Sequence, residues 1–380
     1  MKRRNFLALL GGGVVLAAGS TLGVVATRTP DKALTPWQNA GGDQYSDPRM
    51  RALSYAILAP NPHNRQPWLV DLFKDNQIIL TVDTNKLLPH TDPFSRQITI
   101  GLGCFLEVLR MAAAQDGYRV DIAVFPEGSD TTALDQRPIA VIDMVEDEII
   151  EPDPLFAHIF ERRSLKEPFD ITKKVSSDLL TSVADAALYT NTATTNDESE
   201  VAKLRKLTRD AFTIELDTPR TYKESVDLFR IGKKEIEANP DGIDFSGPMF
   251  ETMGFFGLMS REGALDTNSI EFEEGKKAIY AQTDTGMAYL WVVTNGNSRE
   301  DQINAGRDWV RINLATTREN IGLQPMSQAL QEYAEMKVLY EQIHHDLAPD
   351  GGTVQMFARL GYAERVAPSP RWPIEAKILS

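Results

Sequence analysis

Residues 59–68 read A-P-N-P-H-N-R-Q-P-W, and this stretch predicts a stiff, extended loop. Proline fixes its own φ and restricts the residue before it, so three prolines leave this backbone little freedom. Residues 51–58 before it have a helical pattern, and residues 69–73 after it alternate like a half-buried strand. The polar side chains of residues 63–66 can hold the edge of a flat ligand. The loop can equally be a plain connection, because Pro and Asn favour loops for local reasons.

Two further motifs carry basic side chains. Residues 161–169 read E-R-R-S-L-K-E-P-F, with Arg162 and Arg163 side by side. The tail reads L-G-Y-A at residues 360–363 and P-R-W-P-I-E at residues 370–375. Paired arginines can form an anion site, but beside a helix end they can also simply complement the helix dipole. The residues alone favour the second interpretation.

Together, the three motifs resemble those of the flavin-dependent nitroreductase family. The loop is similar to the family's A-P-S-x-x-N-x-Q-P-W element, whose Asn and Gln contact FMN. Residues 161–169 are similar to its R-R-S-x-[RK]-x-[FY] cofactor motif. The tail resembles its closing G-Y-x…R-x-P-[LI]-E segment, whose Arg faces the FMN phosphate. The order of the motifs is inverted here and the chain is about twice as long as an ordinary member, so the closer resemblance is to the Acg-like FMN-binding subgroup, in which two such units are fused.

The resemblance implies one FMN site, because one half of the chain carries the loop and the other half carries the arginines. The phosphate of FMN carries close to two negative charges, which planar guanidinium groups match with paired hydrogen bonds. Arg162, Arg163 and Arg371 are expected to supply these groups. Ser164 is expected to add a hydroxyl donor.

The resemblance also implies contacts to the flavin ring. Asn64 and Gln66 are expected to bond the ring or ribityl chain, and Lys166 or Arg65 is expected near the pyrimidine edge, where a cation raises the reduction potential. An exposed Lys166 without this role is the alternative. Backbone N–H groups of residues 325–327 are expected at the other edge. The expected cofactor-binding residues are Arg162, Arg163, Ser164, Lys166, His63, Asn64, Gln66, Pro325, Met326, Ser327 and Arg371; no residue is assigned a catalytic role.

Residues 245–263 are rich in Met and Phe among glycines. Methionine and aromatic side chains stack adaptably on flat rings, so this segment is interpreted as a lid over the flavin or as a core helical hairpin. An FMN-dependent oxidoreductase acting on a small nitroaromatic or quinone-like substrate is the leading hypothesis. A protein that sequesters flavin with little turnover, as a closed lid would impose, is the alternative, and a cofactor-free relic is a third.

The remaining pattern predicts an α+β fold, because strands and helices are interleaved without regular βαβ alternation. By resemblance, this is a nitroreductase-like fold of two units in an intrachain pseudo-dimer, residues 46–150 and 151–380, after a tether at 27–45. Helices are expected at 51–58, 96–115, 155–163, 174–187, 198–212, 222–238, 299–321 and 332–346. Strands are expected at 69–73, 77–83, 119–125, 138–145, 287–294 and 353–360.

Residues 1–26 have the composition of a targeting segment. The twin arginine in K-R-R-N-F-L at residues 2–7 precedes an apolar stretch, and small residues at 24–26 offer a cleavage point. This pattern favours twin-arginine export of a folded, cofactor-loaded protein to the periplasm or cell envelope, with the export machinery as a partner. An ordinary secretory signal and an uncleaved anchor are the alternatives.

The net charge of -14 argues against nucleic acid or an anionic membrane as a partner. The expected partners are therefore a small-molecule substrate and an electron donor that the sequence does not identify. A monomer is compatible with the fused units, and the sequence leaves the oligomeric state open. The single cysteine, Cys104, is expected in the core, the glycines at 101 and 103 in a close helix contact, and the histidines at 344–345 on the surface without a metal.

Overall fold

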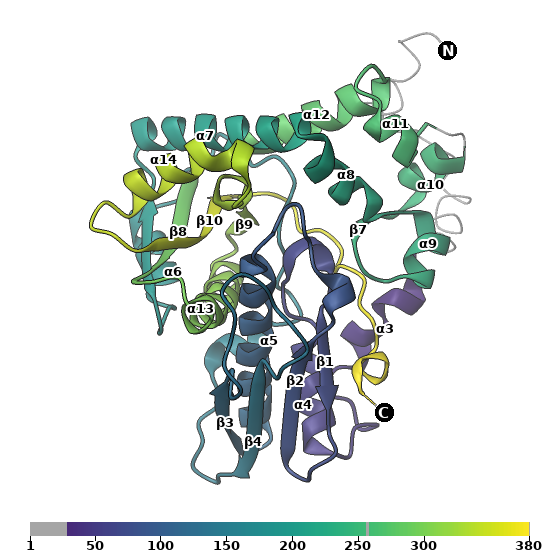
Figure 1. The fold of residues 1–380 in the computed structure, drawn as a ribbon, viewed down its shortest axis with the longest axis vertical. Coiled ribbons are helices and arrows are strands. Elements are labelled where there is room, and N and C mark those ends of the chain that lie inside the picture. Colours follow the sequence, from purple (N-terminus) through teal and green to yellow (C-terminus); the bar gives the residue numbers. More distant parts are fainter. Residues whose placement is uncertain (1–28, 256–257, 380) are drawn as a thin grey trace.

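The computed structural model describes residues 29–255 and 258–379 (Figure 1). Its helices are α3 (Asp31–Asn39), α4 (Pro48–Ala56), α5 (Arg96–Gln115), α6 (Ser177–Ala184), α7 (Glu198–Asp217), α8 (Pro219–Asp227), α9 (Gly232–Ala238), α10 (Pro248–Phe255), α11 (Arg261–Leu265), α12 (Ile270–Thr283), α13 (Arg299–Arg318) and α14 (Lys337–Leu347). Its strands are β1 (Trp68–Asp71), β2 (Gln77–Val82), β3 (Tyr118–Val124), β4 (Ala140–Glu146), β5 (Asn191–Thr195), β6 (Phe229–Ile231), β7 (Ile243–Phe245), β8 (Ala288–Thr294), β9 (Gly322–Pro325) and β10 (Thr353–Gly361). The predicted export signal lies outside the described residues.

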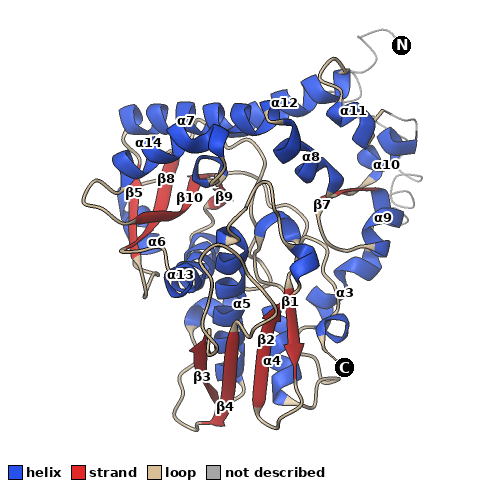
Figure 2. Ribbon diagram, viewed as in Figure 1, coloured by secondary structure: helices blue, strands red, loops and turns tan. Residues whose placement is uncertain are grey.

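The same topology occurs twice along the chain. A short helix, two strands, a long helix and two strands follow one another as α4, β1, β2, α5, β3, β4 and again as α6, β5, β8, α13, β9, β10. The two sheets have matching strand orders, β1-β2-β4-β3 and β5-β8-β10-β9, and all their neighbours are antiparallel. Figure 2 shows the sheets at separate ends of the molecule with α5 and α13 between them. The predicted α+β class is confirmed.

The two halves differ by one large insert. In the first half, the short loop at residues 72–76 joins β1 to β2, whereas in the second half α7 to α12 stand between β5 and β8. This helical insert, residues 198–283, extends across the top and right of Figure 1 and carries the small parallel pair β6 and β7. It therefore reaches from the second sheet over to the first half of the chain.

The core forms where α5 crosses α13. Gly103 and Gly306 are each the eighth residue of their helix, and they meet at the crossing. A Cβ atom on Gly103 would lie 2.2 Å from the carbonyl oxygen of Ile303, and one on Gly306 would lie 1.9 Å from that of Ile100. Only glycine permits this approach, so the predicted close helix contact is confirmed for Gly103, whereas Gly101 packs against Asn61 and Pro62 of the loop.

Cys104 lies in the same crossing and is buried, as predicted. Its thiol donates to the carbonyl oxygen of Gly306 at 3.1 Å, and burial raises its pKa to about 12. It is therefore a core residue and not a nucleophile. Within the described part of the chain, α5 is the one helix long and apolar enough to cross a membrane, but it is buried at the centre of the fold.

The predicted tether is wrong for residues 31–39, which form α3. Its Trp37 is buried, and the indole nitrogen donates to the carbonyl oxygen of Ser369 at 2.8 Å. The composition of this segment is typical of a loop, but burial of one large aromatic side chain stabilises a helix that propensity alone does not favour.

The helix predicted at 222–238 is also wrong, since it is divided into α8, β6 and α9. Gly232 adopts φ +78°, and the aromatic and β-branched residues of β6 pair with β7 instead of continuing the helix. The helix predicted at 155–163 is only the 3-10 turn Pro154–His158. Strand β5 and helix α12 were not predicted, because β5 is a short polar strand and α12 buries little of its surface.

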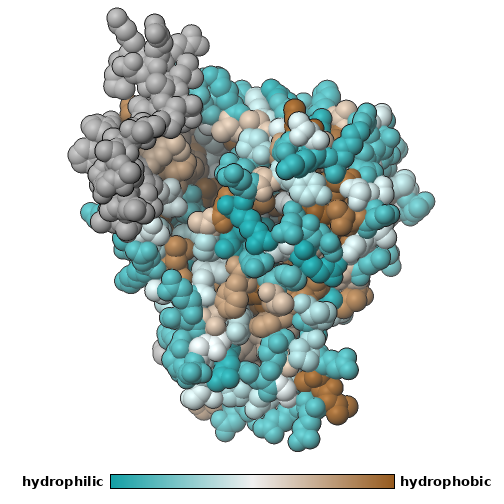
Figure 3. Space-filling view, turned by 180° about the vertical axis from the view of Figure 1, so that it is seen from behind, coloured by the Kyte–Doolittle hydropathy of each residue, from teal (hydrophilic) through white to brown (hydrophobic). Residues whose placement is uncertain are grey.

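Seen from behind, the described surface is mostly hydrophilic, with apolar side chains in a central band (Figure 3). This agrees with the share of charged residues in the chain, 25%.

Candidate functional site

The loop at residues 59–68 is more compact than the extended loop predicted. It contains a 3-10 turn, Pro62–Asn64, and three non-glycine residues in the left-handed region, with φ +48° at His63, +50° at Asn64 and +49° at Gln66. The side-chain oxygen of Asn61 accepts from the Gln66 backbone N–H at 2.7 Å and holds the turn closed. Residues in this region store backbone strain of about 1–3 kcal/mol each, which is typical of ligand-binding loops.

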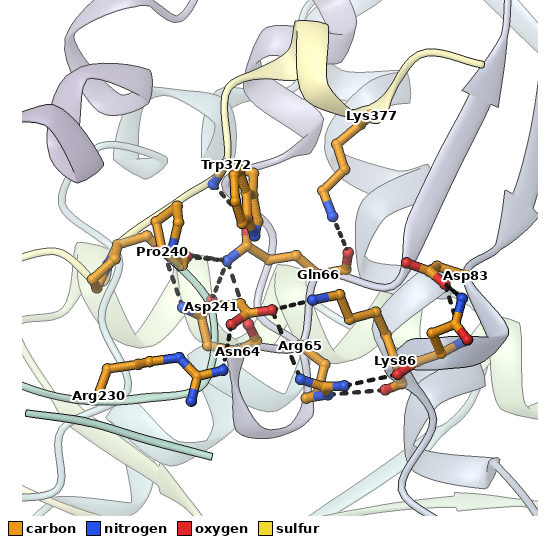
Figure 4. A network of polar contacts seen from close by, with 12 residues as sticks. Asn64, Arg65, Gln66, Asp83, Lys86, Arg230, Pro240, Asp241, Trp372 and Lys377 are labelled. Carbon is orange, nitrogen blue, oxygen red and sulfur yellow. Dashed lines mark hydrogen bonds and ion pairs between the residues drawn. The ribbon is translucent and has the colours of Figure 1, made fainter. Parts of the chain in front are cut away.

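Gln66 fastens this loop to two distant segments (Figure 4). It is fully buried, its Nε2 donates to the carbonyl oxygen of Pro240 at 2.7 Å, and its Oε1 accepts from the Trp372 N–H at 2.9 Å. Lys377 donates to the Gln66 carbonyl oxygen at 2.7 Å. The predicted cofactor residue is thus held in one orientation, with one Oε1 lone pair left for a ligand.

Asn64 and Arg371 bond each other directly. The Asn64 Oδ1 accepts from Arg371 at 2.6 Å, and its Nδ2 donates to the carbonyl oxygen of Pro370 at 3.0 Å. The other N–H groups of Arg371 donate to backbone oxygens at 2.9 to 3.3 Å. These acceptors are Ile57, Leu58, Ala59 and Pro370. All five N–H groups of Arg371 are used, so this arginine clamps the tail onto the loop.

Arg162 converges on the same point from the second half of the chain. Its guanidinium donates to Asn313 Oδ1 at 2.9 Å and to the Leu58 carbonyl oxygen at 3.1 Å, so Leu58 accepts from both Arg162 and Arg371. Three of the five N–H groups of Arg162 have no acceptor among the described residues. The structure therefore brings together the three predicted motifs.

These two buried guanidinium groups have no carboxylate partner among the described residues. Burial, and then the neighbouring charge of Arg163, lower the pKa of Arg162 to about 10. Burial and the charge of Arg162 lower the pKa of Arg371 to about 9. Buried cations without a counter-ion are costly in free energy. The carboxylate of Asp244 acts on Arg371 through its charge but forms no ion pair with it, so the cluster keeps an excess of positive charge.

Trp37 is a member of the site that the sequence did not reveal. Its ring centroid lies 5.1 Å from the Arg163 guanidinium and 5.5 Å from that of Arg371. Arg163 itself donates to the backbone oxygens of Phe160, Arg162 and Val366. The only sequence signal for Trp37 was a tryptophan in a segment otherwise typical of a tether.

His63 and Lys166 lie near each other at the edge of the cluster. The Nδ1 atom of His63 is buried and has no hydrogen-bond partner among the described residues. Burial, then the positive charges of Lys166 and Arg65, lower the pKa of His63 to about 4, so its imidazole is neutral at pH 7. Lys166 is exposed and Ser164 is half-buried, and both follow the arginines on the same segment.

Arg65, the alternative residue for the pyrimidine edge, points elsewhere. It donates to the backbone oxygens of Asn85 and Lys86 and lies 3.7 Å from the carboxylate of Asp241. This buried ion cluster occupies its charge, so the structure gives no support to Arg65 as the cation at a flavin edge.

The backbone donors expected at residues 325–327 are also largely absent. Pro325 has no N–H, and the Met326 N–H donates to the carbonyl oxygen of Phe357 at 2.8 Å as β9 joins β10. That leaves the Ser327 N–H as the remaining candidate. The strand does adjoin the arginine segment, because the Leu165 N–H donates to the Leu323 carbonyl oxygen at 2.8 Å. The sequence did not reveal that these residues form a strand.

No family model matches the chain. Over 158 residues it is 28% identical to "Putative NAD(P)H nitroreductase acg" of Mycobacterium tuberculosis, a match that covers 41% of this chain and 47% of that relative. The chain thus spans about half the length of the curated relatives it matches. This sequence similarity supports a nitroreductase-like relationship.

Solved structures with some likeness also come from this group. A crystal structure of a "putative nitroreductase" from Anabaena variabilis is 12% identical, with a TM-score of 0.45, covering 87% of this chain and 91% of that one. The FMN-dependent nitroreductase NfnB from Mycobacterium smegmatis, solved in complex with NADPH, is 13% identical, with a TM-score of 0.35, covering 58% of this chain and 95% of that one.

Proposed function

We propose that this protein is an FMN-dependent oxidoreductase of the nitroreductase superfamily, with two nitroreductase-like units fused in one chain. The observation that carries the proposal is the pair of buried guanidinium groups of Arg162 and Arg371, which share the Leu58 carbonyl oxygen without a carboxylate. When bound, FMN would accept two electrons from a donor and pass them to a second substrate at the same ring face.

The phosphate of FMN fits the charge of this cluster. Arg162 offers three unused N–H groups, and the hydroxyl of Ser164 follows two residues later. A phosphate here would form charge-assisted hydrogen bonds, a strong class of hydrogen bond, with a buried cation that forms no ion pair among the described residues. Arg371 would contribute charge, while its N–H groups hold the loop in place.

The ring would lie against the residues of the loop. The neutral imidazole of His63 has one buried, unused nitrogen, and Gln66 keeps one acceptor site. Lys166, whose charge already acts on His63, would supply the cation near the pyrimidine edge. These residues bind and orient, and none of them is assigned a role in breaking a bond.

The two halves share a topology, but the corresponding arginine of the second half is paired with carboxylates, and this difference supports one flavin per chain. Ala186 lies two residues after α6, as Leu58 lies two residues after α4, and its carbonyl oxygen accepts from Arg311 at 2.8 Å. Here, however, Arg311 bonds the carboxylates of Asp153 at 2.5 Å and Glu107 at 3.0 Å. Internal carboxylates therefore neutralise the arginine that would otherwise face a second phosphate.

The alternative function is flavin sequestration with little turnover. Asp244 leads into the Met/Phe segment, and its pKa, raised mainly by burial, is pulled down by the charges of Lys166 and Arg371. The segment therefore starts beside the candidate site, where it could cover the ring. Its described aromatics also pack on one another, with Phe245 4.8 Å from Phe229 and 5.3 Å from Phe250 between ring centroids.

The proposed substrate class rests on the resemblance, and the proposed location rests on the sequence of the first residues. A small nitroaromatic or quinone-like substrate would approach the open ring face. The twin-arginine pattern of residues 2–7 supports export of the loaded protein to the periplasm or cell envelope. Nicotinamide cofactors are cytoplasmic, so an exported form would use another electron donor.

The first test is a visible spectrum of the purified protein, followed by anaerobic titration with dithionite and then with NADPH. We expect bound flavin at one equivalent per chain that dithionite reduces. Reduction by NADPH would establish an accessible ring and an oxidoreductase. Reduction by dithionite alone would favour sequestration or an envelope donor. A colourless protein that takes up no FMN would overturn the proposal.

A further inference from the structure

Asp241 is a buried carboxylate that gathers three cations from separate parts of the chain (Figure 4). Only 1% of its side chain is exposed. Arg230 of β6 donates to it at 2.9 Å, Lys86 hydrogen-bonds it, and the guanidinium of Arg65 lies 3.7 Å away. Arg65 belongs to the loop at residues 59–68, called the cofactor loop below. Lys86 belongs to the turn after β2, and Arg230 to the helical insert.

The residues on either side of Asp241 also hold the cofactor loop. The Pro240 carbonyl oxygen accepts from Gln66 Nε2 at 2.7 Å, and the Gly242 N–H donates to the Asn64 carbonyl oxygen at 3.3 Å. Gly242 has φ +81°, and a Cβ atom there would lie 2.3 Å from the Leu228 carbonyl oxygen. Residues 240–242 therefore bond three consecutive residues of the cofactor loop.

The attachment of residues 240–242 to the cofactor loop depends on the negative charge of Asp241. Burial alone would raise the pKa of Asp241, but hydrogen bonds and charge from Lys86 and Arg230 outweigh burial and keep the pKa below its ordinary value. The described residues offer Arg65, Lys86 and Arg230 no other carboxylate within ion-pair distance. Without the charge of Asp241, three cations would face one another in a partly buried space.

We propose that Asp241 is a positioning residue for the cofactor loop: it fastens the helical insert to residues 64–66 and so sets the orientation of the Asn64 and Gln66 side chains. In this role Asp241 acts through the loop and needs no contact with the cofactor. The inference rests on the proposed FMN site, because its functional consequence is the affinity of that site. With this role, the helical insert, which has no counterpart in the first half of the chain, contributes to the flavin site.

The test compares Asp241→Asn with Asp227→Asn. The control removes a carboxylate from the same insert, where Asp227 forms an exposed pair with Lys223. Two quantities are measured: FMN affinity by flavin fluorescence, and hydrogen exchange of residues 61–68 and 238–246 in the flavin-free protein. We expect Asp241→Asn to weaken FMN binding by about tenfold or more and to speed exchange in both segments together, while Asp227→Asn matches the wild type.

A second variant covers the case in which Asp241→Asn does not fold. Lys86→Met weakens the same cluster at a side chain that is 23% exposed, and it should speed exchange in both segments to a smaller extent. Combining it with Asp241→Asn removes one unpaired cation and should recover part of the lost FMN affinity. Wild-type exchange and affinity in the foldable variants would overturn the role of Asp241. If the wild type binds no FMN at all, the proposed function fails. Hydrogen exchange of the flavin-free protein then still tests whether Asp241 fastens the loop.

Discussion

Replacing Arg162 by Met tests the phosphate site most directly. The change keeps an apolar side chain in the buried space and removes the guanidinium that has three unused N–H groups. Two charge-assisted hydrogen bonds to a phosphate contribute about 1.5–3 kcal/mol each, so their loss should cost roughly 3–6 kcal/mol of binding free energy. This corresponds to FMN binding that is about 100-fold to 10,000-fold weaker.

Arg162→Met should change the stability of the flavin-free protein much less than it changes FMN binding. Arg162→Met removes donors to Asn313 and Leu58, but Leu58 keeps its bond from Arg371, and the repulsion between the two guanidinium groups disappears. These effects oppose each other, and we expect the free energy of unfolding to change by about 1 kcal/mol or less. Loss of binding with little loss of stability is therefore the signature of a cofactor contact.

Titration with FMN and with riboflavin, which lacks the phosphate, separates the two explanations. In the wild type, FMN should bind far more tightly than riboflavin, and in Arg162→Met the two affinities should converge. An equal loss for both ligands would show that Arg162 acts only by shaping the loop. An unchanged FMN affinity would refute the phosphate assignment.

Three further predictions concern stability. Arg371→Met should destabilise the flavin-free protein by about 3 kcal/mol or more, since five hydrogen bonds clamp the loop, and chemical denaturation without flavin checks this. The folded-state pKa of His63 is depressed from 6.5 to about 4, so the free energy of unfolding of the wild type should fall by up to about 3 kcal/mol relative to His63→Gln as pH falls from 6.5 to 4. Urea unfolding at several pH values measures this difference. Parallel pH curves for the two proteins would contradict the burial of a neutral imidazole. Gly306→Ala should cost about 1–3 kcal/mol or more, as overpacking of a core does, and a wild-type melting temperature would disprove the close helix crossing.

Much of the fold was predictable from the sequence. Helix α5 was predicted with the bounds that the structure has, and β2 and β8 to within a residue, because long periodic segments and β-branched runs carry strong local signals. The close contact at Gly103 was predictable because glycine lets another backbone approach a helix closely. Where the local signal was weak, as in α3, β5 and α12, packing decided the structure.

For the candidate site, too, the sequence predicted one part and the tertiary structure decided the rest. The sequence alone determined which residue types could bind a phosphate and a polar ring, since guanidinium, amide and imidazole groups have fixed hydrogen-bonding chemistry. It could not determine which of them share a space, because Leu58, Arg162 and Arg371 are far apart in the chain and meet only when both halves fold against each other.

Only the tertiary structure separated Arg162, which keeps unused N–H groups, from Arg371, whose donors are spent on the loop, and from Arg65, which belongs to the Asp241 cluster. It alone brought Trp37 against the arginines and placed residue 240 beside Gln66. The physical reason is that a side chain's role depends on burial and on the charges around it, and both are properties of the folded chain.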